Sequence, residues 1–288
     1  MELVHLHTFL AVADAESITQ AAHRLSCVQS NVTTRINRLE QELQASLFIR
    51  SQRGVSLTAY GQAFYPKARK IIDLVQQLQC PDGADLVRGN LCIGAVETVA
   101  VLGMPAVIAQ LSSAYPALTV ELKTGTSQEL IRALKNFKID AAIVSGMVDD
   151  AALSAVVLKE DELVLVHSAY FAAAAISRKA GPESLYVFRQ GCAFRAALEA
   201  WLYAIKAVPQ VINEISSLDG IMAHVASGRG VTALPRRTVE QHALHGKLRM
   251  SPLPVRYGKI KTSLVRLQDN DDDARLDAFL RAVRAAFD

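Results

Sequence analysis

The sequence has few cysteines and no long apolar run, and each of these absences argues against a class of protein. It has four cysteines in 288 residues, Cys27, Cys80, Cys92 and Cys192, and no pair with C-x-x-C spacing, which argues against cysteine-rich metal sites and disulfide-stapled domains. No apolar run approaches the length of a membrane span, since FAAAAI at 171–176 is typical of the longest. Glu2 stands where a secretory signal would carry a positive charge. We therefore expect a cytoplasmic protein with no membrane association and with free thiols.

Catalytic signatures are also missing. The sequence contains no G-x-S-x-G, Walker A, H-E-x-x-H or G-x-G-x-x-G motif. His242 and His245 are spaced as metal ligands can be, but no third ligand follows at a useful spacing. The acidic run at 269–273 suits the N-terminus of a helix without any ion. We expect no catalytic site, no cofactor and no metal. Cys192 leaves a redox role open, because it stands beside a predicted helix start.

Charge is distributed unevenly, although the net charge is only +3. From Arg24 to Lys70 there are eight basic residues and two acidic ones, whereas residues 81–288 hold 23 basic and 22 acidic residues. Basic side chains concentrated in one segment are typical of a surface that contacts phosphates. The N-terminal part is thus the candidate nucleic-acid-binding region.

Three short helices are predicted in that region. Leucines recur at helical spacing from Leu3, and Ser17 with Gln20 forms a capping-box signal for a second helix. A third helix covers QSNVTTRINRLE at 29–40, where apolar residues fall on one side and polar and basic residues on the other. Two helices joined by a tight turn, the second exposing amides and hydroxyls, suit the major groove of DNA. The alternative is a surface helix that only solvates its polar face.

A basic hairpin and a long helix follow. LFIRSQRGVSL at 47–57 has two strand-like pieces around an arginine-containing turn, which predicts a wing that lies along a DNA backbone or in a minor groove. From Thr58, a plausible N-cap, a helix is predicted to about Gln79. Its apolar residues form the seam of a coiled coil, although packing on its own domain is an alternative; they are Phe64, Ala68, Ile71, Val75 and Leu78. Residues 80–90 are rich in Pro, Gly and Asp and indicate a hinge.

From residue 91 strand-like runs alternate with helical patterns, which predicts an α/β fold with largely parallel sheets. The strand-like runs are LCIGAV, LTVELKT, DAAIVSG, ELVLVH, SLYVF, GVTALP and KTSLVRL. The helical patterns cover 103–114, 127–137, 193–205, 217–227 and 273–286.

Several segments resemble LysR-type transcriptional regulators. FLAVADAESITQAAHRL at 9–25, QSNVTTRINRLE at 29–40 and LFIRSQRGVSLTAYG at 47–61 are similar to that family's N-terminal region, and YPALTVELKTG, ALKNFKIDAAIV and VASGRGVTALP more loosely to its effector domain. Cys27 and Val28 depart from the Ser or Thr that the family commonly has near this helix start, and Asn31 replaces a common alanine. The family's known operators therefore do not carry over to this chain.

The resemblance implies a domain organisation and partners. It implies an N-terminal winged helix-turn-helix over 1–57, a linker helix that dimerises over 58–79, a hinge over 80–90 and a two-lobed, periplasmic-binding-protein-like effector domain over 91–288. Lobe I would comprise about 91–161 and 266–288, and lobe II about 162–265. The implied partners are a double-stranded DNA operator, a small-molecule effector and further copies of the chain in a homodimer and homotetramer. A solute-binding protein or an α/β enzyme with an added N-terminal region is the runner-up.

The candidate DNA contacts follow from the third helix and the wing. Base edges would be contacted by Gln29, Ser30, Thr33 and Thr34, and phosphates mainly by Arg35, Arg38, Arg50 and Arg53. Asn31 adds a further contact to a base or a phosphate.

The candidate effector site is placed by the rule that ligands of α/β domains bind at the carboxyl ends of strands. The residues at those ends are Glu97, Thr98, Val99, Thr126, Ser127, Ser145, Gly146, Phe194, Arg195, Ser216 and Ser217. Hydroxyls and the backbone amides at helix starts favour binding of an anion. Arg195 could form a bidentate pair with a carboxylate, and Glu97 could form an ion pair with an ammonium group. A small carboxylate or an amino acid is thus expected. Alternatively, Thr126, Ser127 and Ser217 are ordinary N-caps and Arg195 is a surface residue.

Overall fold

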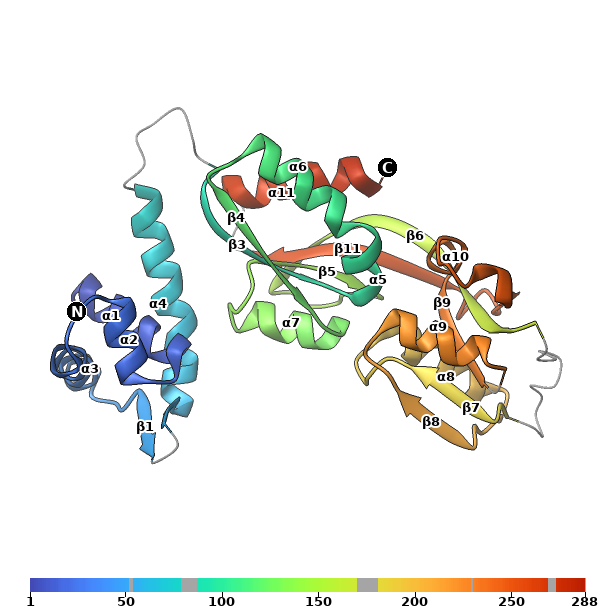
Figure 1. Ribbon diagram of the computed structural model, residues 1–288, viewed down its shortest axis with the longest axis horizontal. Helices are drawn as coiled ribbons and strands as arrows, with labels where there is room; N and C mark the ends of the chain where they lie inside the picture. Colours follow the sequence, from blue (N-terminus) through green and yellow to red (C-terminus); the bar gives the residue numbers. More distant parts are fainter. Residues whose placement is uncertain (52–53, 79–86, 170–180, 229, 269–272, 288) are drawn as a thin grey trace. The chain divides into compact units, whose positions relative to one another are not determined.

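The computed structural model describes residues 1–51, 54–78, 87–169, 181–228, 230–268 and 273–287. The chain forms two compact units, Met1–Leu86 and Val87–Asp288 (Figure 1). The cysteine at 80, most of the predicted hinge over 80–90 and most of the acidic run lie outside the described residues. None of the helices that the structure describes is long and apolar enough to cross a membrane.

The first unit begins with the three predicted helices, α1 (Leu3–Ala15), α2 (Ile18–Arg24) and α3 (Gln29–Leu43). The predicted N-cap of α2 is confirmed, because the Ser17 hydroxyl accepts a hydrogen bond from the backbone N–H of Gln20. The apolar stripe of α3 is buried with Phe9 of α1 in one core. One face of α3 is thereby fixed against α1 and α2, and its opposite face is left to solvent.

The predicted wing is a hairpin of β1 (Phe48–Ser51) and β2 (Gly54–Leu57), paired antiparallel. Two contacts fix its position. The Glu40 carboxylate of α3 accepts hydrogen bonds from the backbone N–H groups of Leu47 (2.6 Å) and Phe48 (3.1 Å). The backbone N–H of Val55 donates to the carbonyl of Glu16 at 3.1 Å. The wing is therefore held to both α3 and the end of α1.

Helix α4 (Ala59–Leu78) follows the wing directly. Its predicted N-cap is confirmed, since the Thr58 hydroxyl accepts from the backbone N–H of Gly61 at 2.9 Å. A Cβ at Gly61 would lie 2.2 Å from the carbonyl oxygen of Leu47, so only glycine allows this close approach.

The predicted seam of α4 is used partly within its own unit. Phe64 packs against Phe9 with ring centroids 5.2 Å apart, and Ala68 is fully buried in the same core. Ile71 packs on that core as well. For these residues the alternative prediction, packing on the helix's own domain, is confirmed. Further along, Leu74 is 49% exposed and Val75 is half-buried.

Lobe I of the second unit is built on parallel strands β3 (Gly89–Ala95), β4 (Leu118–Thr124) and β5 (Ala141–Ser145). Strand β3 begins inside the range predicted to be a hinge. Helices α6 (Met104–Ala114) and α11 (Ala274–Phe287) cover one face of this sheet and α7 (Ser127–Lys135) the other, as Figure 1 shows. The short helix α5 (Glu97–Leu102) follows β3. A single apolar core joins these elements.

Lobe II repeats the scheme with parallel strands β7 (Ser184–Val187), β8 (Val211–Glu214) and β9 (Gly230–Pro235). Its helices are α8 (Ala193–Ala204), α9 (Leu218–Ala226) and α10 (Arg236–Glu240), and a second apolar core lies among them. A 3₁₀ turn (His245–Lys247) leads to β10 (Leu248–Pro252), which pairs with β6 (Leu153–Ser168).

Two long strands, β6 and β11 (Lys259–Leu267), join the lobes. Strand β11 pairs antiparallel with β5 of lobe I and with β6, while β6 pairs antiparallel with β9 of lobe II. The sheet is therefore mixed, and the prediction of largely parallel sheets holds only for the outer strands of each lobe. Antiparallel pairing arises because the chain crosses between the lobes twice, once in each direction.

Candidate DNA-binding surface and effector pocket

The outer face of α3 presents polar side chains that its packing does not use. Gln29, Ser30, Asn31 and Thr34 are exposed and Thr33 is half-buried. Val28 precedes the helix as N-cap and makes no side-chain cap, so the first-turn amides of α3 are not covered by a capping hydroxyl. Amides and hydroxyls at the open end of a helix can contact base edges or phosphates.

The four arginines predicted to contact phosphates differ in their exposure and in their partners. Arg35 is half-buried on α3. Arg38 pairs with Glu2 at 3.3 Å and Glu42 at 3.6 Å, but its side chain is 61% exposed. Exposed ion pairs of this kind contribute little, so Arg38 can exchange them for a phosphate. Arg50 belongs to β1, and Arg53 lies outside the described residues.

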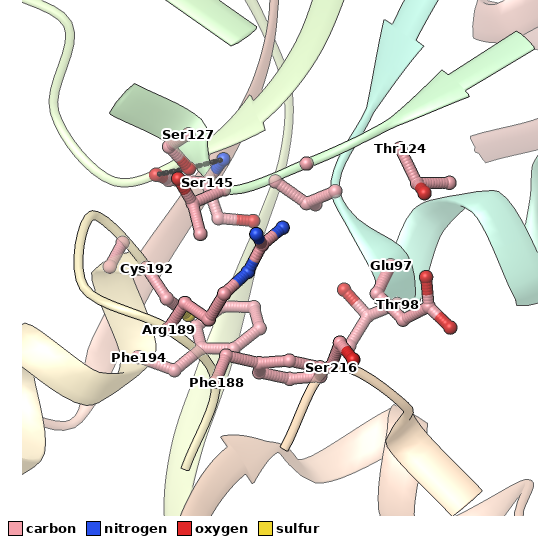
Figure 2. A pocket seen from close by; sticks show the side chains of 14 residues that line it. Glu97, Thr98, Thr124, Ser127, Ser145, Phe188, Arg189, Cys192, Phe194 and Ser216 are labelled. Atoms are coloured by element: carbon pink, nitrogen blue, oxygen red, sulfur yellow. Dashed lines mark hydrogen bonds between the residues drawn. The ribbon is translucent and has the colours of Figure 1, made fainter. Parts of the chain in front are cut away.

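A pocket lies between the two lobes of the second unit (Figure 2). The empty space inside it, open solvent included, is about 550 Å³. Pockets between lobes or domains are common binding sites for small molecules. Its lining comes from the carboxyl ends of β3, β4, β5, β7 and β8 and the start of α8, and consists of Val96, Glu97, Thr98, Thr124, Gly125, Thr126, Ser127, Ser145, Phe188, Arg189, Cys192, Ala193, Phe194 and Ser216. The structure thus brings together seven of the eleven candidate effector contacts, which are Glu97, Thr98, Thr126, Ser127, Ser145, Phe194 and Ser216.

Two serines on the lobe I side differ in their hydrogen bonding. The Ser127 hydroxyl donates to the Ser145 carbonyl at 2.8 Å and accepts from the Ser145 backbone N–H at 3.1 Å. It therefore ties α7 to the end of β5. The Ser145 hydroxyl is itself buried and has no hydrogen-bond partner among the residues that the structure describes. Because a buried hydroxyl without a partner is costly, this oxygen marks a place where a ligand's polar group would be stabilised.

Arg189 extends into the pocket from the loop after β7, as Figure 2 shows. Its guanidinium contacts the Glu129 carboxylate of α7 at 3.5 Å, and both side chains are about half exposed, at 56% and 43%. Glu129 also accepts from the backbone N–H of Thr126 at 2.9 Å and completes a capping box. That bond, with the nearby arginines, lowers the pKa of Glu129. Arg189 thus holds a long, solvated ion pair that a ligand anion can replace.

Arg195 does not have the expected role. It is buried and absent from the pocket lining, and its guanidinium donates to Glu199 (2.7 Å), to Glu214 (2.5 Å) and to the carbonyl of Phe188 (3.2 Å). These contacts also raise its pKa despite its burial. The interpretation as a surface residue was equally wrong. Arg195 instead anchors the loop that carries Arg189.

Three further candidates lie beside the pocket rather than in it. Val99 faces a separate hollow with Lys159 and Phe287. Gly146 has φ +102°, and a Cβ there would lie 2.9 Å from that of Ala193 in lobe II, so this glycine lets the lobes approach. The Ser217 hydroxyl accepts from the backbone N–H of Gly220 and is an ordinary N-cap of α9.

Cys192 lines the pocket at the N-cap of α8. Burial raises the pKa of its thiol, although the backbone N–H groups of Arg195 and Phe194 donate to the sulfur and act in the opposite direction. A thiol held protonated is a poor nucleophile, so its surroundings favour packing over redox chemistry.

Sequence reasoning missed Phe188 and Arg189, and also Thr124 and Gly125. The rule that placed the other candidates could have found them, because Phe188 follows β7 and Thr124 ends β4. After β4 and β7 the predicted candidates begin only at Thr126 and Phe194, so the residues nearer to these strand ends were left out.

The pocket and the N-terminal helices match known protein families. Residues 3–62 match the family "Bacterial regulatory helix-turn-helix protein, lysR family", and residues 84–288 match "LysR substrate binding domain". The chain is 35% identical to the HTH-type transcriptional regulator CzcR of Bacillus thuringiensis subsp. konkukian over 98% of this chain and 97% of that protein. It is 31% identical to the HTH-type transcriptional regulator GltR of Bacillus subtilis over 100% and 97%.

Solved structures share the fold. A full-length OxyR variant from Pseudomonas aeruginosa superposes with a TM-score of 0.78 at 22% identity, covering 99% of this chain and 98% of that one. Full-length LysG from Corynebacterium glutamicum, with bound effector Arg, gives 0.67 at 18% identity over 100% and 98%. The chain belongs to the LysR family of bacterial transcriptional regulators, which bind DNA through the N-terminal helix-turn-helix and a small-molecule effector through the C-terminal domain.

Proposed function

We propose that the effector of this regulator is a small carboxylate or an amino acid that binds in the pocket between the lobes. Its anionic group would lie at the lobe I side, against the Ser145 hydroxyl, with the Arg189 guanidinium reaching it from lobe II. Binding would draw on residues of both lobes, so ligand occupancy would favour one arrangement of the lobes over another. The chain would have no catalytic activity of its own and would act in the cytoplasm, where the DNA is.

One observation carries this proposal. Within the described part of the chain, the Ser145 hydroxyl is buried at the pocket wall without a hydrogen-bond partner, and Arg189 reaches the same cavity with a solvated ion pair to Glu129 as its one ion pair. A carboxylate oxygen would accept from both groups. Removing either donor should weaken binding by about 1.5–3 kcal/mol, which is the usual contribution of a hydrogen bond to a charged group.

The test is a thermal-shift screen of small carboxylates and amino acids on the full-length protein. A true effector should stabilise the wild type and should lose most of that effect with Ser145→Ala and Arg189→Ala. Arg132→Ala is a matched control, because Arg132 is an exposed arginine of α7 outside the pocket. A ligand whose stabilisation is undiminished in both pocket variants would place the effector site elsewhere.

We also propose a division of DNA contacts. Gln29, Ser30, Thr33 and Thr34 would contact base edges, while Arg35 and Arg38 with the wing arginines Arg50 and Arg53 would contact phosphates; Asn31 would serve either. The exposed polar face of α3 and the open N-terminus of that helix support this assignment.

Finally, we propose that α4 pairs with its counterpart in a second chain, and that such dimers associate into tetramers. The exposed Leu74 and the half-buried Val75 support pairing through the later turns of α4, beyond the residues used in the core.

A further inference from the structure

The two sides of the effector pocket differ in the charge they offer. Figure 2 shows Ser127 and Ser145 on one side and the Glu97 carboxylate on the other, with Thr98, Thr124 and Ser216 near Glu97. Glu97 is the first residue of α5 and is half-buried. The pocket therefore presents hydroxyl and guanidinium donors on one side and an anionic acceptor on the other.

Glu97 differs from two other carboxylates of this unit in having no cationic partner among the described residues. Glu129 and Glu162 each pair with an arginine, and the pKa of each is lowered. Among the residues that the structure describes, no lysine, arginine or histidine forms an ion pair with Glu97. Burial, and then the nearby Asp219 of lobe II, raise its pKa. A helix N-terminus ordinarily stabilises the charged form of an acidic side chain. For Glu97, burial and the charge of Asp219 outweigh this effect, because the net shift of its pKa is upward.

The neighbouring acid does not turn this side of the pocket into a metal site. Asp219 is held by the His242 imidazole at 2.8 Å. In the described part of the chain no group of three His, Cys, Asp or Glu side chains is placed to hold a metal ion. A carboxylate flanked by hydroxyls suits an ammonium group, which carries three N–H donors and no acceptor.

We propose that the effector is a zwitterion, with an ammonium bound by Glu97 and a carboxylate bound at Ser145 and Arg189, and that Glu97 is the residue that selects it. This inference rests on the proposed carboxylate pocket. It narrows the effector class to amino acids and related amino-carboxylates and excludes plain carboxylates as the preferred ligands.

The unpartnered Ser145 hydroxyl supports this choice independently of Glu97. It offers a donor that a ligand's anion can use on the lobe I side, and Glu97 lies across the same cavity. If Glu97 served only to complement the short helix α5, its replacement would change stability slightly and would leave ligand preference untouched.

The experiment compares ligands that differ only in an amino group. Each standard amino acid is titrated into the full-length protein beside its des-amino carboxylate, for example glutamate beside glutarate and leucine beside 4-methylpentanoate. The pair of 4-aminobutyrate and butyrate is added. For the effector class, the wild type should bind the amine-bearing member about tenfold more tightly or better, the value of one charged hydrogen bond.

Three variants localise the selection. Glu97→Gln keeps the size of the side chain and should abolish the preference, and Glu97→Lys should reverse it. Glu183→Gln removes an exposed carboxylate of lobe II outside the pocket and should keep the preference. The melting temperature of each unliganded variant confirms that it folds.

The outcomes separate the two proposals. If the wild type binds both members of its best pair equally, or if Glu97→Gln keeps the preference, the zwitterion inference is overturned while the carboxylate pocket stands. If no member of any pair binds, the carboxylate pocket is overturned and this inference falls with it.

Discussion

At the scale of single residues, two arginines close together in sequence have opposite tasks. Arg195 is buried and holds the carbonyl of Phe188, whereas Arg189 is half exposed in the pocket. We predict that Arg195→Ala lowers the free energy of unfolding of the effector domain by about 1–3 kcal/mol, because the Phe188 carbonyl loses its donor. Its partners Glu199 and Glu214 are exposed, so water would solvate their carboxylates after the substitution and the lost ion pairs would add little to the cost. Urea unfolding measures the loss.

Arg189→Ala should behave differently. Its stability should stay within about 0.5 kcal/mol of the wild type, as for most surface substitutions, while effector affinity falls. Equal losses of stability in the two variants would contradict the assignment of Arg195 as the anchor and Arg189 as the ligand-binding group.

The DNA-binding face allows a second comparison between single residues. We predict that Thr33→Ala costs about 1–3 kcal/mol on the operator and relaxes preference at one base position, while non-specific binding is unchanged. Arg35→Ala should weaken binding to all sequences alike and should reduce the slope of log K against log salt by about one. Binding titrations at several salt concentrations measure both effects, and identical profiles for the two variants would refute the division.

The thiol of Cys192 gives a prediction for pH. Since burial raises the pKa of this thiol, it stays protonated, and hence unreactive, at pH values where an ordinary cysteine has begun to ionise. Its alkylation by iodoacetamide, followed by peptide mass spectrometry, should be slow near neutral pH in the folded protein and fast in urea. The folded rate should rise only at higher pH. Rapid modification of the native protein near neutral pH would reopen the redox interpretation.

At the scale of elements, periodicity predicted what is long and regular. In the second unit all seven predicted strands and all five predicted helices exist, because each buries a side-chain pattern that repeats over several residues. The helices α5 and α10 and the strands β8 and β10 were missed. Strand β8, for example, is a short edge strand with Val211 and Ile212 exposed. Its sequence therefore lacks the alternation of buried and exposed residues from which a strand is predicted.

Residues of the effector pocket could be predicted only where the end of a strand could be predicted from the sequence. Thr98, Ser127 and Ser145 were found by that rule, since each follows or ends a strand with a clear pattern. The role of Arg195 could not be found in this way. Its partner Glu214 is 19 residues away on a strand that the sequence did not reveal. Burial of a charged group depends on tertiary neighbours, which no local pattern encodes.

Helix α4 carries the prediction that belongs to this scale. We predict that Leu74→Asp combined with Val75→Asp converts dimers to monomers in sedimentation at micromolar concentration, because two charges would enter the proposed helix pair. Ile71 is a poorer choice, since it packs on the core of its own unit. Gln62→Asp, at an exposed position of the same helix, should leave the dimer intact. A wild type that is monomeric under these conditions would refute the proposal.

At the scale of the whole molecule, the chain consists of two compact units with separate cores, and the two binding functions are divided between them. A two-fold dimer would place two copies of α3 on DNA, so the operator should be partly palindromic, with half-sites related by the same symmetry. Selection of bound fragments from a random DNA pool, followed by sequencing, tests this. Recovered sites without paired half-sites would mean that one helix-turn-helix binds alone.

Separate cores also predict how each partner stabilises the chain. In differential scanning calorimetry, we expect distinct transitions for Met1–Leu86 and Val87–Asp288. Effector at about 100 times its dissociation constant should add about 2.7 kcal/mol to the unit that binds it and should raise only the second transition. Operator DNA should raise only the first. Arg189→Ala should reduce the response to effector and keep the response to DNA. If the effector raised both transitions equally, the two units would unfold as one cooperative body, and the division of binding energy between them would be wrong.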